Sequence, residues 1–237
     1  MIRFIIAVLF ITVFFIFSII LYPIYFIIGK FNINLRHRIS LATIQWVFRV
    51  ISFIAGAKVD VKGREKVPEG PVLYVANHRS VFDIIIGYTI VDRITGFISK
   101  QEVKKYPFLS WWMYFMNCLF LDRSNVREGL KTILKAIEME KSGISIFIFP
   151  EGTRSKDGSV AEFKGGSFKI AEKAKVPIVP IAISNTEEIF ENHKPSLKST
   201  RVTFEFCEPI YMDQLDKEEK KLVAKMARDE IAEKVEK

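Results

Sequence analysis

The sequence is poor in the residues that build metal centres and disulfide frameworks. It holds two cysteines, Cys118 and Cys207, each inside an apolar run, and three histidines, His37, His78 and His193. Two isolated cysteines make neither a disulfide framework nor a zinc site, and three histidines exclude a histidine-rich metal site. We therefore expect no metal. The low cysteine content suits the reducing cytosolic side of a membrane for most of the chain.

Charged residues are absent from the run between Phe4 and Gly29. A helix of that length would be about 39 Å long, against roughly 30 Å of membrane hydrocarbon. Pro23 is expected to kink or end it, which leaves Phe4–Tyr22 at roughly 28 Å. A cleaved signal peptide is not expected, because the apolar run is too long and no small-residue cleavage site follows it. The run therefore predicts a helix embedded in a membrane.

A second helix is expected from about Leu35 to Phe53, with Trp46 suited to a membrane interface. Two interpretations stay open. One is a single transmembrane span followed by an ordinary domain helix, which the residues alone favour slightly. The other is a two-helix hairpin that lies in one leaflet and grips the bilayer from one side. Both place residues 55 onward at a membrane surface.

Basic residues between the two expected helices indicate which side of the membrane the rest of the chain occupies. Lys30, Arg36 and Arg38 outweigh Arg3 near the start of the chain. By the positive-inside rule, the domain that follows lies in the cytoplasm. We therefore expect a protein of the inner cell membrane, with membrane lipids as neighbours and its main domain on the cytoplasmic side.

The pattern changes after Gly56 to short apolar runs that alternate with helical segments. Strands are expected at Lys58–Lys62, Pro71–Ala76, Ile94–Ser99, Asn117–Leu121, Ser145–Phe149, Val176–Ile183 and Val202–Phe206. Helices are expected at Ser124–Glu140, Gly166–Lys175 and Leu215–Val235, the last with Leu222, Val223 and Met226 inward. This alternation predicts an α/β fold, with a mixed sheet flanked by helices and preceded by a two-helix membrane-binding module. We expect residues 1–54 to form that module and residues 55–237 to form the α/β domain.

The overall balance of the chain is apolar and basic. It is 49% hydrophobic, with a net charge of +8 and a pI of about 9.4. A basic chain suits nucleic acid, anionic lipid or an acidic partner equally well. The basic residues do not cluster in a stripe with exposed aromatic residues, so no nucleic-acid partner is expected.

A polar turn follows the expected strand at Pro71–Ala76. It contains His78, and Asp83 should fall in the first turn of the next helix. A carboxylate placed there can hold one imidazole nitrogen and leave the other free as a general base. The alternative is structural: Ser80 and Asp83 have the spacing of a capping box, in which Asp83 only caps the helix.

A second polar turn follows the expected strand Ser145–Phe149. Glu151 and Arg154 supply a carboxylate and a guanidinium that matches a phosphate, and Gly152 lets the backbone approach a ligand. The alternative is a surface loop held by a Glu151–Arg154 salt bridge.

Two further strands are expected to end in cations, at Lys100 and Arg123. Lys100, Arg123 and Arg154 should therefore meet at one edge of the sheet, beside His78 and Asp83. Convergent cations beside a His–Asp pair suggest an anionic substrate with a hydroxyl or carbonyl group to be activated.

These segments resemble, in order and spacing over roughly residues 60–210, the motifs of the glycerolipid acyltransferases. Asn77–Asp83 resembles the His-x4-Asp motif, and Phe120–Arg123 the second motif. Phe149–Ser155 resembles the third, in the form typical of 1-acyl-sn-glycerol-3-phosphate acyltransferases, and Val176–Pro180 the fourth. The resemblance implies that His78 and Asp83 carry catalysis. It also implies a glycerol phosphate site made by Lys100, Arg123, Glu151, Gly152, Thr153 and Arg154.

The reaction that the resemblance implies is acyl transfer to the sn-2 hydroxyl of lysophosphatidic acid, which yields phosphatidic acid. The donor would be a thioester of acyl carrier protein or coenzyme A, with no cofactor. No serine or cysteine nucleophile is evident, so we expect direct transfer with His78 as the base. The alternatives are a glycerol-3-phosphate or other lysophospholipid acyltransferase, a thioester hydrolase that uses the same His78, and a non-catalytic membrane-binding protein.

Overall fold

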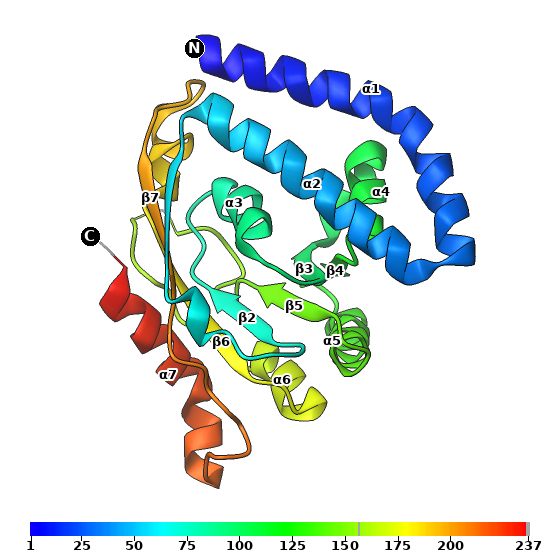
Figure 1. Cartoon of the computed structure of the whole chain (residues 1–237). Coiled ribbons are helices and arrows are strands. Elements are labelled where there is room, and N and C mark those ends of the chain that lie inside the picture. The colour runs from blue at the N-terminus through cyan, green and yellow to red at the C-terminus, as the bar shows by residue number, and fades with distance from the viewer. Residues whose placement is uncertain (156, 236–237) are drawn as a thin grey trace.

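A seven-stranded sheet forms the centre of the computed structural model, which describes residues 1–155 and 157–235 (Figure 1). Its strands lie in the order β1-β7-β6-β2-β5-β3-β4. β7 runs antiparallel to β6, and all the other neighbours are parallel, so the sheet is mixed, as predicted. The strand bounds are β1 Lys58–Lys62, β2 Leu73–Ala76, β3 Thr95–Lys100, β4 Leu119–Leu121, β5 Ser145–Ile148, β6 Ile178–Ser184 and β7 Arg201–Phe206.

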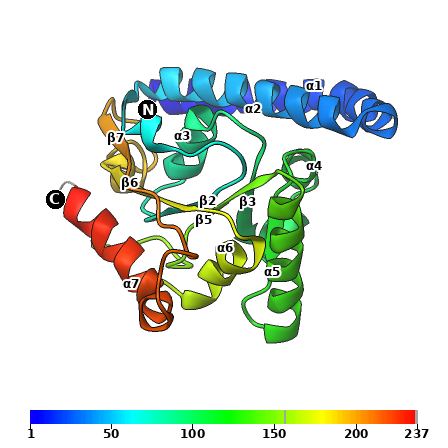
Figure 2. The ribbon, with the colours of Figure 1, turned by 60° about the horizontal axis from the view of Figure 1, so that its bottom comes forward.

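Helices cover both faces of the sheet (Figure 2). One apolar cluster joins one face to α1 (Ile2–Phe31), α2 (Ile33–Ala55), α3 (Phe82–Ile90) and α4 (Pro107–Phe115). The other joins the opposite face to α5 (Val126–Lys141), α6 (Lys169–Ala174) and α7 (Lys217–Lys234). Short 3-10 helices lie at Arg64–Lys66, Gln101–Lys105, Gly165–Phe168, Thr186–Glu188 and Glu191–His193.

Burial on both faces explains the continuous apolar runs that mark the central strands. Within β2, Leu73 and Val75 join one cluster, whereas Tyr74 and Ala76 join the other. Successive side chains of a strand point to opposite faces, so a strand covered on both sides needs apolar residues throughout. The edge strand β1, in which charged residues and valines alternate, is exposed along its length.

The two N-terminal helices form a hairpin along the α/β body. Asn32 separates them and caps α2, its side-chain oxygen accepting from the Leu35 amide at 2.9 Å. Pro23 does not end α1, which continues to Phe31 and bends along its length (Figure 1). Both helices are long and apolar enough to cross a membrane.

The hairpin contacts the body near both of its ends. Phe4 of α1 stacks on Phe190 of the body with ring centroids 5.7 Å apart, and the indole N–H of Trp112 in α4 donates to the Ser18 hydroxyl at 2.8 Å. Side chains of α1 and α2 share one apolar cluster with the sheet. The hairpin therefore packs as part of the same core as the domain that follows it.

Helix α4 was not predicted from the sequence, because its residues are apolar nearly throughout and show no polar face with a helical period. The expectation about the inward residues of α7 was partly wrong. In α7, Val223 is buried as expected, but Leu222 is 54% exposed and Met226 is 37% exposed. The inward stripe of α7 consists of residues four apart, namely Val223, Ala227 and Ile231.

A buried carboxyl group makes the stability of this fold sensitive to pH. Glu140, in the last turn of α5, has no exposed surface. Burial raises the pKa of its carboxyl from 4.5 to about 8, and the Ile146 amide opposes the shift. Between these values the folded protein holds a proton that the unfolded chain has lost. The free energy of unfolding therefore falls as the pH rises through this window.

We expect Glu140→Gln to stabilise the protein at alkaline pH, because glutamine has no proton to lose. Thermal unfolding of both proteins in one detergent, at about pH 5 and about pH 9, measures the effect. The melting temperature of the variant minus that of the wild type should be larger at about pH 9 than at about pH 5. The change corresponds to up to a few kcal/mol in the free energy of unfolding. An equal difference in melting temperature at both pH values would contradict a raised pKa for Glu140.

Candidate active site

Four parallel strands end at one edge of the sheet and bring the predicted site residues together there. The neighbours β2, β5, β3 and β4 run in the same direction, so their carboxyl ends meet. A cavity of about 750 Å³ lies at this edge. The predicted residues on its walls are His78, Lys100, Arg123, Gly152, Thr153 and Arg154. The expected convergence of the polar turns is confirmed.

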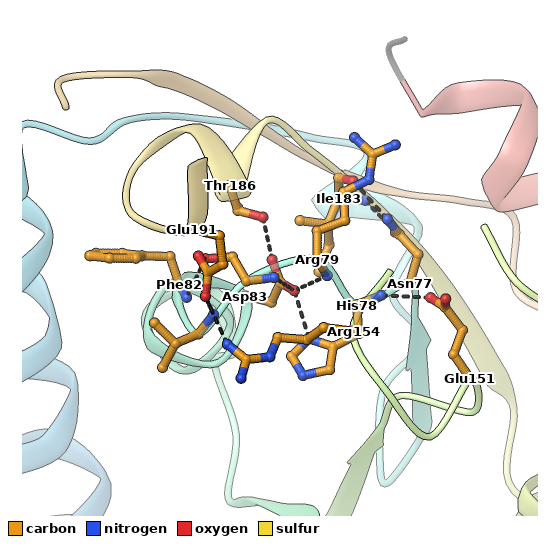
Figure 3. Close-up of polar contacts among 12 residues, drawn as sticks. Asn77, His78, Arg79, Phe82, Asp83, Glu151, Arg154, Ile183, Thr186 and Glu191 are labelled. Atoms are coloured by element: carbon orange, nitrogen blue, oxygen red, sulfur yellow. Dashed lines mark hydrogen bonds and ion pairs between the residues drawn. The ribbon is translucent and has the colours of Figure 1, made fainter. Parts of the chain in front are cut away.

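His78 lies on the cavity wall and is hydrogen-bonded to the buried Asp83 (Figure 3). Imidazole Nδ1 lies 2.7 Å from Asp83 Oδ2, with the carboxylate fully buried and 15% of the His78 side chain exposed. The ring of Phe149 stacks on the imidazole with centroids 4.2 Å apart. Because a carboxylate only accepts hydrogen bonds, Nδ1 carries the proton and Nε2 is left with a free lone pair.

The buried Asp83 carboxylate is saturated with donors. Oδ2 also accepts from the backbone amides of Arg79 at 2.6 Å and Ser80 at 2.8 Å. Oδ1 accepts from the Thr186 hydroxyl, which follows β6. These bonds fix the carboxylate against rotation and compensate for its removal from water.

Asp83 also caps the turn before α3, so the two interpretations of the Ser80–Asp83 spacing hold together. Its carboxylate binds two amides ahead of the helix, and the Ser80 hydroxyl oxygen accepts from the Phe82 amide at 3.0 Å. The structural role of Asp83 places its oxygen where the imidazole can donate to it.

The turn after β5 holds the backbone of His78 from both sides. Glu151 Oε1 accepts from the His78 amide at 2.7 Å, and the Ser155 amide donates to the His78 carbonyl oxygen at 2.8 Å. Glu151 Oε2 accepts from the Ala161 amide at 3.2 Å. Burial raises the pKa of Glu151, and the two amide hydrogen bonds oppose that shift.

The alternative of a Glu151–Arg154 salt bridge is not found, because Arg154 binds Glu191 Oε1 at 2.8 Å instead. Glu151 is also missing from the described residues that line the cavity, and its role in holding the glycerol phosphate stays a prediction. A carboxylate that is 6% exposed and engaged by two backbone amides acts on the loop that carries His78.

Three predicted cations face the cavity from three turns. Lys100 is the last residue of β3, Arg123 follows β4, and Arg154 follows β5. Burial lowers the pKa of Arg123. Gly152 has a φ of 80°, a left-handed conformation that favours glycine. A β-carbon at Gly152 would lie 3.0 Å from Lys164 Nζ, so glycine also leaves room for the Lys164 side chain.

The sequence analysis missed the segment after β6, which forms another wall of the cavity. Its residues there are Glu187, Glu191, Asn192 and Lys194. Glu187 binds Arg79, another lining residue, at 2.9 Å. The available signal was topological: β6 is a parallel neighbour of β2, so residues after both strands meet at one edge. Among the described residues, no group of three or more His, Cys, Asp or Glu could hold a metal ion.

The fold and the site define an α/β enzyme with a polarised histidine beside a cation-lined cavity. The Acyltransferase family model matches residues 58–184, which contain β1 to β6 and every predicted site residue. The chain belongs to this acyltransferase family.

Several curated relatives are named 1-acyl-sn-glycerol-3-phosphate acyltransferase. The Saccharomyces cerevisiae protein is 30% identical over 86% of this chain and 67% of its own length. The Borreliella burgdorferi protein is 30% identical over 84% of this chain and 80% of its own. A chloroplastic protein of Brassica napus is 37% identical over 77% of this chain, which spans about half (52%) of that relative.

A solved structure is also similar. The crystal structure of the 1-acyl-sn-glycerophosphate acyltransferase PlsC from Thermotoga maritima aligns with a TM-score of 0.70 at 27% identity. The alignment covers 92% of this chain and 96% of that chain.

We expect Glu151→Gln to destabilise the protein. The amide keeps one acceptor oxygen for two backbone donors, and its own N–H groups then face one of them, which should cost about 1–3 kcal/mol. Thermal unfolding measures the loss. Glu162→Gln, at an exposed position of the same loop, is the matched control and should change little. Equal melting temperatures for the two variants would contradict the assigned role of Glu151.

Proposed function

We propose that the protein transfers an acyl group from a thioester to the sn-2 hydroxyl of lysophosphatidic acid, which yields phosphatidic acid for phospholipid synthesis. The observation that carries this proposal is the His78–Asp83 pair in one cavity with Lys100, Arg123 and Arg154. The names of the curated relatives support the same acceptor.

His78 is the proposed general base. Its Nε2 takes the proton of the sn-2 hydroxyl as that oxygen attacks the thioester carbonyl. The new C–O ester bond forms, the C–S bond breaks, and the departing thiolate recovers the proton from the imidazolium. General-base assistance contributes typically about 10²–10⁴-fold, and Asp83 stabilises the positive imidazolium.

Direct transfer without an acyl-enzyme is consistent with the bonds of Ser80, the serine that lies between His78 and Asp83 in the sequence. The Ser80 hydroxyl donates to Glu191 and accepts from the Phe82 amide, so it does not bond to His78. The thioester comes from acyl carrier protein or coenzyme A, and the reaction requires no cofactor. Both donors share the thioester chemistry that the mechanism uses.

The acceptor's phosphate is assigned to Lys100, Arg123 and Arg154. Guanidinium groups match phosphate oxygens in geometry, and the cavity removes part of the competing water. Gly152 and Thr153 line the same wall and leave the backbone accessible to the ligand. The runner-up acceptor is glycerol 3-phosphate, which carries the same phosphate without an acyl chain.

Membrane attachment favours the lipid acceptor. We propose that the hairpin of residues 1–54 lies in one leaflet of the inner cell membrane, with the domain of residues 55–237 on the cytoplasmic side. Phe4 stacks on Phe190 of that domain with ring centroids 5.7 Å apart. A helix crossing the bilayer would carry Phe4 to the far side, so this contact supports the hairpin over the span.

Charge and exposed aromatic residues support the same placement. The chain has no Asp or Glu before Asp60, but the hairpin carries five basic residues, which suits anionic headgroups. In α4, Trp111 is 50% exposed and Tyr114 is 60% exposed, and both residue types favour the membrane interface. An acceptor already held in the bilayer then reaches the cavity with its headgroup at the interface.

We expect lysophosphatidic acid to be acylated far better than glycerol 3-phosphate. Both present a phosphate to the same cations, but a buried acyl chain adds roughly 0.8 kcal/mol per methylene, which concentrates the lyso lipid at the membrane. The test offers both acceptors at equal concentration with one acyl donor and resolves the products. Predominant acylation of glycerol 3-phosphate would promote the runner-up.

The controls for this assay are His78→Ala and Asp83→Asn. The first should lower turnover at least about 10²-fold, the lower range for general-base catalysis. Asp83→Asn should also be severe, because an amide can cap the helix but does not stabilise the imidazolium. Near-normal turnover by His78→Ala would reject the mechanism. Hydrolysis of the acyl donor at the same rate with and without an acceptor would indicate a thioesterase.

The hairpin predicts that the N-terminus is labelled from the cytoplasmic side. A maleimide reagent applied to sealed vesicles of known orientation should reach Ile2→Cys from the same side as Glu218→Cys, an exposed control in α7. The native Cys118 and Cys207 are buried. Labelling of the two positions from opposite sides would establish a transmembrane span.

A further inference from the structure

Glu191 joins two parts of the site that come from different strands (Figure 3). Its Oε1 accepts from Arg154 Nη1 at 2.8 Å and from the Val81 amide at 3.0 Å. Its Oε2 accepts from the Ser80 hydroxyl. Glu191 therefore connects the arginine after β5 to the turn that carries His78.

The carboxylate of Glu191 is held as part of the catalytic turn. Only 13% of its side chain is exposed, so donors must replace much of its water. Val81 directly precedes α3, and amides at a helix N-terminus attract negative charge. With Ser80 and Val81 as donors, Glu191 is anchored to the turn independently of its bond to Arg154.

Arg154 gains a fixed position from this contact. Its side chain is 49% exposed, and a long side chain at a surface loses conformational entropy when it is ordered. Among the described residues, Glu191 is its only hydrogen-bond partner, and it engages a single terminal nitrogen. The other N–H groups of the guanidinium remain for a ligand in the cavity that Arg154 lines.

We propose that Glu191 is a positioning residue for the acceptor's phosphate, an inference that rests on the proposed function. It orders Arg154 before the substrate arrives and sets the separation between the phosphate site and His78. In lysophosphatidic acid, two carbon atoms separate the phosphate ester oxygen from the sn-2 hydroxyl oxygen. A fixed spacing between the arginine and the base therefore selects the hydroxyl that reaches His78.

A double-mutant cycle on ligand binding tests this role. The proteins are the full-length wild type, Glu191→Gln, Arg154→Ala and the double variant, in one detergent. The probe is a short-chain lysophosphatidic acid, titrated by calorimetry without an acyl donor. Glu191→Gln should raise the dissociation constant about tenfold in the wild-type background, because Arg154 is no longer ordered. In the Arg154→Ala background it should have almost no effect.

Turnover and a matched control separate positioning from folding. Glu191→Gln should raise the KM for lysophosphatidic acid and leave the KM for the acyl donor unchanged, whereas a general defect would move both. The control is Glu188→Gln, a carboxylate on the same segment that pairs with His193 and Lys198 and accepts from Asn192 at 2.6 Å, a bond that the glutamine oxygen can keep. Its side chain has no described bond to Arg154 or to the turn that carries His78. It should match the wild type in every measurement.

Three results would overturn the role of Glu191. The first is an unchanged dissociation constant in Glu191→Gln. The second is tighter binding of the probe by this variant, which would mean that Glu191 competes with the phosphate for Arg154. The third is an equal loss of affinity in the wild-type and Arg154→Ala backgrounds. Acyl transfer by the wild type is measured separately. If the wild type binds the probe but does not acylate it, the proposed function is rejected, and the double-mutant cycle still measures the coupling between Glu191 and Arg154. If acyl transfer is normal but Glu191 and Arg154 show no coupling in binding, only the role of Glu191 is rejected.

Discussion

The Asp83 carboxylate has no exposed surface, and a buried charge costs several kcal/mol unless donors surround it. The turn from Asn77 to Asp83 meets this requirement with two backbone amides, and the segment after β6 adds the Thr186 hydroxyl. The imidazole of His78 supplies the remaining hydrogen bond. The same bonds that compensate the charge therefore set the tautomer of His78, the start of α3 and the position of the segment that carries Glu191.

Helix α3 connects this site to the N-terminal hairpin. Asp83 lies in its first turn, and at its far end Gln45 of α2 donates to the carbonyl oxygens of Tyr88 and Val91 at 3.0 and 2.8 Å. The hairpin also shares one apolar cluster with the sheet. The proposed membrane anchor and the candidate base thus belong to one packed unit, which would hold the cavity at a constant position relative to the lipid headgroups.

Much of the fold could be predicted because its signals are local. Apolar runs bounded by polar residues marked six of the seven strands, since central strands buried on both faces admit few polar side chains, and alternation of charged and apolar residues marked the exposed β1. The failures have equally physical causes. Helix α4 lacks a polar face that would have marked it as a helix. In α7, Leu222 and Met226 lie beside the buried stripe, because the packing of a whole helix decides which apolar residues face inward.

The sequence by itself determined the chemistry: a histidine five residues before an aspartate, and cations placed after strands that a parallel sheet brings to one edge. The partners of those groups were decided only by the tertiary structure. Glu151 binds the His78 backbone, and Arg154 binds Glu191, thirty-seven positions further along the chain. Local spacing fixes which residues share a turn. The partner that a buried charge finds depends on which segments the sheet order places beside it, and no local pattern encodes that order.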